Sequence, residues 1–578
     1  MDLRAALSRF AVALAVALLA PAPAAAAQSA GTPGSTAAGI EVSAELPERP
    51  PDYAIGPRAA IRIANRDPKV AETRERYGEL RASVEASQPG TWQVGYFAGD
   101  VERAQVLVDD ATASVRESWT GYQVAWQMAR GYEGSFGHLL NAPYVWLPLC
   151  AIFFFGLFDW RRPRRVAHLD LLVLLAFGVS HVFFNRGEIG LSVPLAYPML
   201  VYLLGRMLWV GFRGAGEGLR PAAPLAWLAI AAAFLIGFRV ALNVADSGVI
   251  DVGYSGVIGA DRAVDGAPLY GEGAFPDDNQ FGDTYGPVNY YAYVPFEQLL
   301  PWSGTWDDLP ASHAAAIFFD LSVAALLLVL GRRLRPGREG RDLGVILVFA
   351  WAAFPYSDYV LQSNSNDSLV PALVLAALVL IASPVGRGAM TALAGLTKFA
   401  PLALAPLFAA GPRAGLASTD PDTGERPLDR RRLRALVLFA LAMIGVGALA
   451  LLQALVDPGL ATFWDRTIGE QIDRESPFSI WGQEPSLEPL RTGLLIATAG
   501  LAVLLAFLPR RRTPARIAAL AAAVMIALQI TAEHWFYLYI VWFFPLAVAA
   551  LAGERPAVGR DVSRPQEADH GEELVTVP

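Results

Sequence analysis

The chain has 578 residues, of which 54% are hydrophobic and only 17% are charged, with a formal net charge of −8. Its apolar residues gather in runs of about 18 to 22, long enough to cross ~30 Å of hydrocarbon as helices. This pattern excludes an ordinary soluble domain and predicts a polytopic membrane protein. The single cysteine, Cys150, excludes an intramolecular disulfide framework. No basic cluster is interleaved with aromatic residues, which argues against a nucleic-acid partner.

The first 51 residues have the character of a targeting segment followed by a spacer. Residues 1–27 carry Arg4 and Arg9, then AVALAVALLA and an A-x-A pattern, which predict a secretory signal peptide cleaved near Ala27. An uncleaved anchor helix is the alternative. Residues 28–51 are rich in Ser, Thr, Gly, Pro and Ala without periodicity, and predict a disordered linker.

Residues 52–140 are predicted to form a small extracytoplasmic α+β domain. Asp67-Pro68 marks the start of a polar helix that continues through VAETRERYGELRASVEA. The segments TWQVGYFA and QVLVDDATASVRESW are β-rich and are separated by a turn at Gly99-Asp100. The arrangement is similar to PepSY-like modules. No catalytic constellation is found in this domain, which favours a structural or assembly role.

Apolar spans and arginine-rich loops then alternate, and their order predicts the topology. We expect accessory transmembrane helices over residues 141–220, the membrane core over 221–553 and a disordered cytoplasmic tail over 554–578, with about 12 to 13 spans in the cell membrane. The N-terminal domain would face outward. Near Lys398, two short half-crossings are expected, because a single crossing would place the arginines of 430–434 outside.

Residues 246–310 interrupt the apolar spans with eleven carboxylates, one arginine and no lysine. Such a stretch cannot lie in hydrocarbon, where its charges and amides would be unsatisfied, so it is predicted to be an aqueous loop. Because loops on a rigid scaffold often carry function, we expect the active site on this outer face. Further polar residues fall at the outer ends of predicted spans and predict a shared external cavity: Asn364 to Asp367, Lys398, Arg474 and His534.

The sequence DVGYSGVIGADRAVDGAPLYG at residues 251–271 resembles the first-loop signature of GT-C type membrane glycosyltransferases, especially glycosyltransferase family 87. YGPVNYYAYVPFEQLLP resembles the family's Tyr-Pro-Pro segment, QSNSNDSL its Gln-x-Asn motif and LTKFAPLALAP its Lys-x-x-Pro hairpin. The resemblance covers about Leu225 to Ala552. It implies an all-α GT-C-like core carrying an inverting hexosyltransferase or pentosyltransferase of the mannose or arabinose class.

The same resemblance implies the substrates. The donor would be a polyprenyl-phosphate sugar, and the acceptor a cell-envelope glycolipid, polysaccharide or protein on the extracytoplasmic face. No cofactor is implied, and no stretch has ligand spacing that defines a metal site, so the need for a divalent metal stays open.

Inverting transfer needs a base for the acceptor hydroxyl and fixed cations for the leaving phosphate. Asp251 is expected to be the base, made more basic by desolvation at the membrane boundary. Three residues are expected to bind the donor phosphate: Lys398, Arg474 and His534. Five are expected to contact substrate: Tyr270, Tyr285, Asn364, Asn366 and Asp367.

Each assignment has a structural alternative. Asp251 would simply end the preceding span, Lys398 would be an interfacial lysine, and the run at 364–367 would cap the next helix. Arg474 would pair with an adjacent carboxylate, and the loop tyrosines would form an interfacial belt. The rival function is a transporter or lipid flippase with a periplasmic sensor domain, which predicts charged residues buried within spans and pseudo-symmetric halves.

Overall fold

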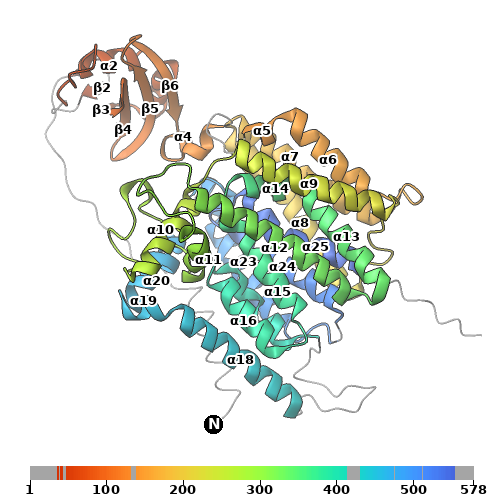
Figure 1. Cartoon of the computed structure of the whole chain (residues 1–578). Coiled ribbons are helices and arrows are strands. Elements are labelled where there is room, and N and C mark those ends of the chain that lie inside the picture. Colours follow the sequence, from red (N-terminus) through yellow and green to blue (C-terminus); the bar gives the residue numbers. More distant parts are fainter. Residues whose placement is uncertain are drawn as a thin grey trace, which may run out of the picture.

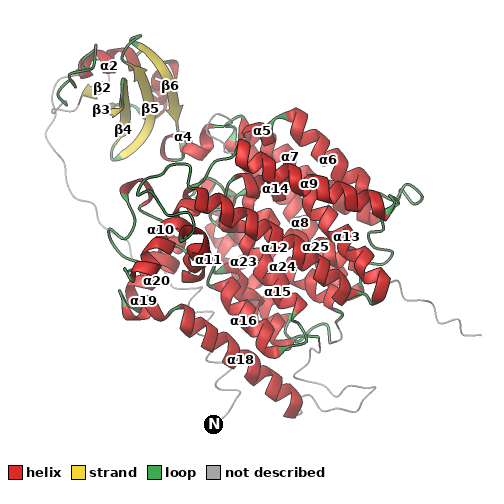
Figure 2. Ribbon diagram, viewed as in Figure 1, coloured by secondary structure: helices red, strands yellow, loops and turns green. Residues whose placement is uncertain are grey.

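The computed structural model describes residues 36–37, 40–42, 47–131, 138–412, 430–473, 476–510 and 512–553. The predicted signal peptide, most of the predicted linker, the predicted tail and Arg474 lie outside the described residues. A small domain with a β-sheet sits at one end of a large helical part (Figures 1 and 2).

The small domain holds a sheet whose strands lie in sequence order, with one parallel pair, β2 with β3. Val84, Val94 and Val106 are opposite one another on adjacent strands and are all buried, because α2 and α3 cover this face of the sheet. The elements are β1 (Thr36–Ala37), β2 (Ile40–Val42), α2 (Pro57–Ala64), α3 (Pro68–Tyr77), β3 (Leu80–Gln88), β4 (Thr91–Ala98), β5 (Val101–Asp109) and β6 (Ser114–Thr120).

The predicted polar helix begins where expected but ends early. Asp67 caps α3 by accepting a hydrogen bond from the backbone N–H of Lys69. The helix stops at Gly78, whose φ of +83° lies in the region that favours glycine. The second half of the predicted helix is wrong, because Leu80, Ala82 and Val84 are buried at alternate positions and form the strand β3.

The helical part is built from short and long helices with irregular connections. They are α4 (Tyr122–Ala125), η1 (Gln127–Arg130), α5 (His138–Asn141), α6 (Pro143–Leu157), α7 (Val166–Asn185), α8 (Ile189–Arg213), α9 (Leu225–Ala245), α10 (Asp251–Asp265), η3 (Asp277–Asn279), α11 (Pro287–Glu297), α12 (Pro310–Leu334), α13 (Gly337–Ala353), α14 (Pro355–Gln362), η4 (Asn366–Ser368), α15 (Leu369–Val379), α16 (Pro384–Gly395), η5 (Ala400–Leu404), α17 (Ala405–Ala410), α18 (Arg430–Ala450), α19 (Leu452–Val456), α20 (Leu460–Trp464), the π-helix η6 (Asp465–Gly469), α21 (Glu470–Asp473), α22 (Ile480–Gln483), η7 (Pro485–Leu487), α23 (Glu488–Leu504), α24 (Pro514–Thr531), η8 (Tyr537–Tyr539) and α25 (Ile540–Gly553).

Within the described residues, seven helices are long and apolar enough to cross a membrane, and α13 with α14 forms an eighth candidate bent by 59°. The bend falls at Phe354-Pro355, because proline disfavours helical geometry in the residue before it. Other predicted spans are shorter apolar helices, such as α6 and α25, so the long apolar helices among the described residues are fewer than the 12 or 13 spans expected. The protein is a polytopic α-helical membrane protein with a small sheet near its N-terminus.

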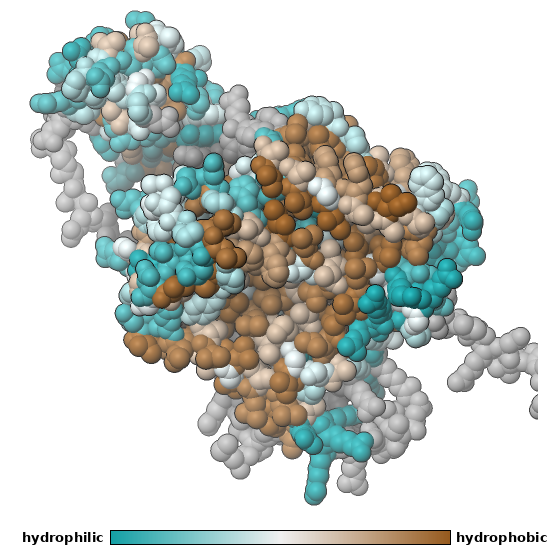
Figure 3. Space-filling model, in the orientation of Figure 1, coloured by the Kyte–Doolittle hydropathy of each residue, from teal (hydrophilic) through white to brown (hydrophobic). Residues whose placement is uncertain are grey.

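The surface of the helical part has the apolar character that a lipid environment favours. On the face seen in Figure 3, hydrophobic residues form a broad band, with hydrophilic residues over the small domain and at the opposite end. On α9, Trp227, Ile230 and Phe234 are each more than two-thirds exposed. α24, in contrast, is mostly buried in the middle of the bundle. Large apolar side chains directed outward on a long apolar helix are typical of lipid contact.

Candidate active site

The acidic loop 246–310 is folded, with α10 and α11 packed against each other at one end of the bundle (Figure 1). Glycines three residues apart line the buried face of α10. A Cβ at Gly256 would lie 2.5 Å from the ring of Tyr293, and one at Gly259 would lie 2.1 Å from the ring of Tyr290. Glycine at these positions is therefore what lets the α11 tyrosines lie directly on α10.

Asn364 joins this loop to the membrane helices. Its side-chain Nδ2 donates to Ser247 Oγ and to the carbonyl of Gly248, both at 2.9 Å. Its Oδ1 accepts from Asn243 Nδ2 at 2.8 Å. Asn364 is fully buried and has a φ of +50°, a conformation that asparagine tolerates better than most residues. The predicted substrate-contacting amide is therefore engaged with the protein itself, where it holds the start of the loop in place.

Asp251 is the first residue of α10 and is exposed. Its backbone carbonyl accepts hydrogen bonds from Ser255 Oγ at 2.7 Å and from Asn279 Nδ2 at 3.1 Å. The backbone N–H of the preceding Ile250 donates to the carbonyl of Ser363 at 3.2 Å, which places Asp251 beside the 363–368 turn. The protein does not bury this carboxylate, so the expected desolvation would have to come from lipid or bound substrate.

The 363–368 turn carries a buried charge next to the loop. Asp367 is fully buried, and its Oδ1 accepts from Lys398 Nζ at 2.7 Å and from Trp542 Nε1 at 2.9 Å. Its Oδ2 accepts from Ser365 Oγ at 2.8 Å. An ion pair with this many hydrogen bonds is the arrangement that a buried carboxylate requires.

Lys398 lies where the chain breaks after α16, and η5 and α17 then pack back against α16, as the predicted interruption requires. Its Nζ lies over three aromatic rings, 5.7 Å from the centroid of Tyr285, 5.4 Å from Tyr539 and 5.2 Å from Trp542. The Lys398 side chain keeps 10% of its surface exposed. The ion pair occupies one of its three N–H donors, which leaves donors for an anion.

His534 borders the same aromatic group. Its Nδ1 lies 2.8 Å from Ser476 Oγ, and its ring centroid lies 6.5 Å from that of Tyr539. Lys398 and His534 therefore both lie near the ring of Tyr539. Tyr539, the last residue of η8, and Trp542, in α25, were missed by the sequence analysis.

The two predicted loop tyrosines touch each other. The Tyr270 hydroxyl donates to the backbone carbonyl of Tyr285 at 3.0 Å, and its ring packs edge-on against Phe463. Burial raises the pKa of the Tyr270 hydroxyl, which stays a hydrogen-bond donor over the whole working pH range. Tyr270 thus supports the residue that lies under the ammonium group of Lys398.

Asn366 faces α11. It is fully buried, and its Nδ2 donates to Asn289 Oδ1 at 2.5 Å. Three buried side-chain atoms of α11 and η4 have no hydrogen-bond partner among the described residues: Asn289 Nδ2, Asn366 Oδ1 and Ser368 Oγ. The site therefore holds polar groups that are poorly satisfied by the protein, a cost that is often accepted at functional sites.

A second ion pair, also missed by the sequence analysis, joins the acidic loop to η6. Arg466, in the π-helix η6, binds Asp283 through Nε–Oδ2 at 2.7 Å and Nη2–Oδ1 at 2.8 Å. Asp283 is fully buried and also accepts from the backbone N–H of Gly271. The hydrogen bonds with Asp283 raise the pKa of Arg466. The two residues are 183 positions apart, so no local pattern indicates the pair.

Charged residues also occur within the membrane helices. Arg239 is fully buried, with Nη1 3.2 Å from Asp320 Oδ1 and Nε 3.8 Å from Asp358 Oδ1. Its Nη2 donates to Ser357 at 2.9 Å. These contacts join α9, α12 and α14, and α14 leads directly into the 363–368 turn. Their placement is that of a scaffold for the turn.

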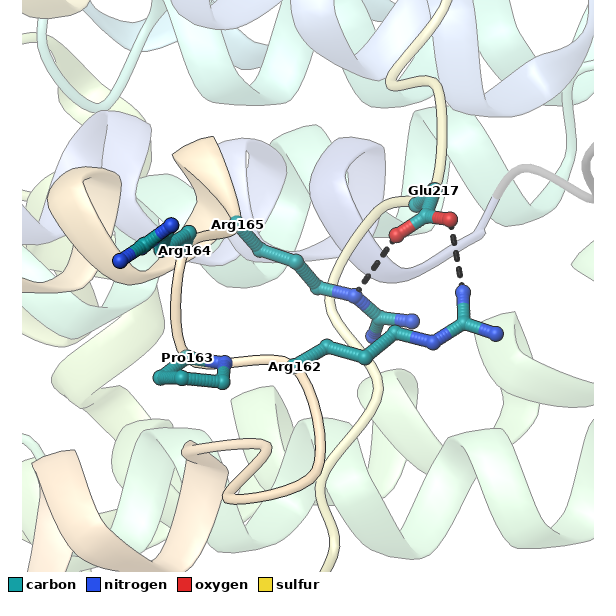
Figure 4. Close-up of a pocket in the computed structure, with 5 residues that line it drawn as sticks. All are labelled: Arg162, Pro163, Arg164, Arg165 and Glu217. Carbon is teal, nitrogen blue, oxygen red and sulfur yellow. Dashed lines mark hydrogen bonds and ion pairs between the residues drawn. The ribbon is translucent and has the colours of Figure 1, made fainter.

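The described residues contain no group of three or more His, Cys, Asp or Glu side chains that could hold a metal ion. A shallow pocket of about 410 Å³ is lined by Arg162, Pro163, Arg164, Arg165 and Glu217 (Figure 4). Arg162 and Arg165 already pair with Glu217, at 2.7 and 3.0 Å. The pocket lies at the start of α7. None of the candidate site residues lines it.

Comparison with known proteins gives one result. Residues 284–532 match the model of glycosyltransferase family 87. No curated protein and no solved structure matches the chain. The matched stretch contains Tyr285, Asp367 and Lys398, whereas Asp251 and His534 lie outside it. Together with the membrane-spanning helices, the match supports a membrane glycosyltransferase.

Proposed function

We propose that the protein transfers a hexose or pentose, of the mannose or arabinose class, from a polyprenyl-phosphate donor to a cell-envelope acceptor on the extracytoplasmic face. The family match supports glycosyl transfer, and it does not favour a transporter or lipid flippase. The observation that carries the proposed donor is the ammonium group of Lys398. It lies at the edge of the acidic loop, largely enclosed by aromatic rings and with a small exposed surface.

A partly enclosed cation suits the phosphate of a lipid-linked sugar. The leaving group of such a donor gains negative charge as the bond to the anomeric carbon breaks, and a fixed cation stabilises that charge more than it stabilises the ground state. Asp367 is fully buried and accepts hydrogen bonds from Trp542, Ser365 and Lys398, so the carboxylate is fixed and holds Lys398 in one position before the sugar donor arrives. The aromatic rings around it would lie against the sugar or the first prenyl units.

The transfer would proceed by a single displacement. The acceptor hydroxyl oxygen attacks the anomeric carbon, the bond from that carbon to the phosphate oxygen breaks, and the configuration inverts. Asp251 takes the proton from the attacking hydroxyl, and polyprenyl phosphate leaves with the electron pair of the broken bond. Asp251 is suited to this role because it is exposed at the start of α10, next to the turn that carries Asp367.

The decisive experiment is a transfer assay in lipid nanodiscs. Purified protein is incubated with radiolabelled polyprenyl-phosphate mannose or polyprenyl-phosphate arabinose, with an envelope lipid extract as acceptor. We expect label to move to the acceptor with one of the donors, and Asp251→Asn to abolish most of the transfer. Absence of transfer with both donors, from protein that is folded and binds lipid, would refute the proposed donor class.

A further inference from the structure

The small N-terminal domain reaches the candidate active site through the segment 121–131. Trp126, in this segment, has its ring centroid 5.7 Å from that of His534 and 5.4 Å from that of Phe478. Phe478 and His534 are themselves 5.5 Å apart. The three rings therefore touch one another in a triangle, and one of them belongs to the part of the chain in which the sequence analysis found no site.

The segment is fastened to the sheet of the small domain by Arg130. Its Nη2 donates to Gln105 Oε1 of β5 at 2.8 Å, and its Nε donates to the carbonyl of Gln123 at 2.9 Å. The Arg130 guanidinium also lies over the ring of Trp119 in β6, 5.2 Å from its centroid. Arg130 thus connects the segment to β5 and β6 of the sheet.

The other side of the segment is fastened to the membrane helices. Gln123 Nε2 lies 3.4 Å from the carbonyl of Gly187, at the turn between α7 and α8. Ala129 is fully buried in the main hydrophobic core. A Cβ at Gly131 would lie 2.9 Å from the carbonyl oxygen of Asn185, so the backbones are in close contact here. The small domain therefore packs against the helical bundle, and this contact holds the ring of Trp126 next to that of His534.

We propose that Trp126 is a positioning residue for His534, and that the N-terminal domain is thereby part of the glycosyl-transfer site. The Nδ1 atom of His534 forms a hydrogen bond with Ser476 Oγ. The imidazole also packs against the rings of Trp126, Phe478 and Tyr539. Removing the indole would let the ring turn away from Tyr539 and from the donor phosphate near Lys398. The effect on catalysis rests on the proposed function, whereas the packing itself does not.

The test compares Trp126→Ala, Trp126→Phe and a matched control, Tyr122→Ala, an exposed aromatic residue of the same segment. We expect Trp126→Ala to raise the KM for the lipid-linked donor about 2- to 10-fold, the usual range for one lost aromatic pair, with little change in kcat. Trp126→Phe should restore most of the loss, and Tyr122→Ala should behave as the unaltered protein. Trp126→Phe also serves as the informative variant if Trp126→Ala does not fold.

A double-mutant cycle with His534→Gln separates a positioning role from general destabilisation. If Trp126 acts through His534, Trp126→Ala has no further effect on donor KM once His534 is replaced. An equal increase in KM with and without the histidine would refute the proposal.

A second measurement is independent of activity. Diethyl pyrocarbonate modifies accessible imidazoles, and peptide mass spectrometry reports the rate at each histidine. We expect Trp126→Ala to speed the modification of His534 and to leave His313, a half-buried histidine of α12, unchanged. An unchanged rate at His534 would overturn the positioning role. If His534→Gln leaves donor KM unaltered, the proposed phosphate contact of His534 fails, and the modification rate alone decides whether Trp126 positions the ring.

Discussion

Lys398 and Asp367 form the buried ion pair at the centre of the candidate site, and Lys398→Met tests it most sharply. Methionine has a side chain of similar length that fills the space beside Tyr285 without the charge. Asp367 would keep its hydrogen bonds from Trp542 and Ser365, yet its carboxylate is fully buried and would have no counter-charge. Removing one partner of a buried pair typically costs about 3–5 kcal/mol of stability.

A second replacement, Asp367→Asn, should recover most of that stability. The asparagine oxygen still accepts a hydrogen bond from Trp542, and no buried charge remains unpaired. The residual loss in the Lys398→Met, Asp367→Asn double variant should be about 1–2 kcal/mol, the value of hydrogen bonds to Lys398 that are not replaced. Thermal unfolding in detergent micelles, followed by tryptophan fluorescence, measures both variants against the unaltered protein.

Donor use separates the structural role of Lys398 from its proposed role at the phosphate. A hydrogen bond to a charged group is worth about 1.5–3 kcal/mol, which corresponds to a roughly 10- to 150-fold higher donor KM. We expect this increase to persist in the stabilised double variant, because the phosphate contact is still absent. The assay is transfer in nanodiscs with the lipid-linked donor varied and the acceptor saturating. If the double variant regains both stability and the original donor KM, Lys398 serves only as the partner of Asp367.

Three further predictions concern the base, the small domain and the topology. Asp251→Asn should lower kcat by a factor of about 10² to 10⁴. Asp246→Asn, which alters a carboxylate that accepts a hydrogen bond from a backbone N–H, should lower it far less. If Asp251→Asn keeps more than about a tenth of normal transfer, the assignment of Asp251 as the base is refuted. Burial raises the pKa of Glu102, so its charged form disfavours folding at pH values above the folded-state pKa, and this penalty disappears once the group is protonated in both the folded and the unfolded state. Glu102→Gln should therefore raise the melting temperature of the domain near pH 7 and leave it unchanged below about pH 4. Circular dichroism would record both melting temperatures. In a background without the native cysteine, an impermeant thiol reagent applied to intact cells should label Ser303→Cys and not Arg338→Cys, both exposed positions, and the reverse pattern would overturn the predicted orientation.

The class of the protein could be predicted from its sequence because the signals are local. Hydrophobic runs of membrane length, the acidic stretch before α12 and the cap at Asp67 are properties of neighbouring residues, and backbone hydrogen bonding makes them decisive wherever they occur. The break near Lys398 was predicted in another way, from the arginines of 430–434, which a single crossing would have placed outside. Where tertiary packing competed with local propensity, prediction failed, as at residues 80–86, where the buried positions of a sheet outweighed good helix formers.

The site itself depends on contacts between residues that are remote in the sequence. Asp367 lies 31 positions from Lys398 and 175 from Trp542, and the pattern at 364–367 is equally typical of a helix cap. Only the tertiary structure shows that Asn364 anchors the loop while Asp367 holds the lysine. Likewise, nothing near Trp126 in the chain indicates His534. The sequence by itself determined where the apolar helices and the polar connections between them lie. The packing of helices determined which of the polar groups meet, because side-chain contacts across a fold depend on the register and tilt of every helix between them.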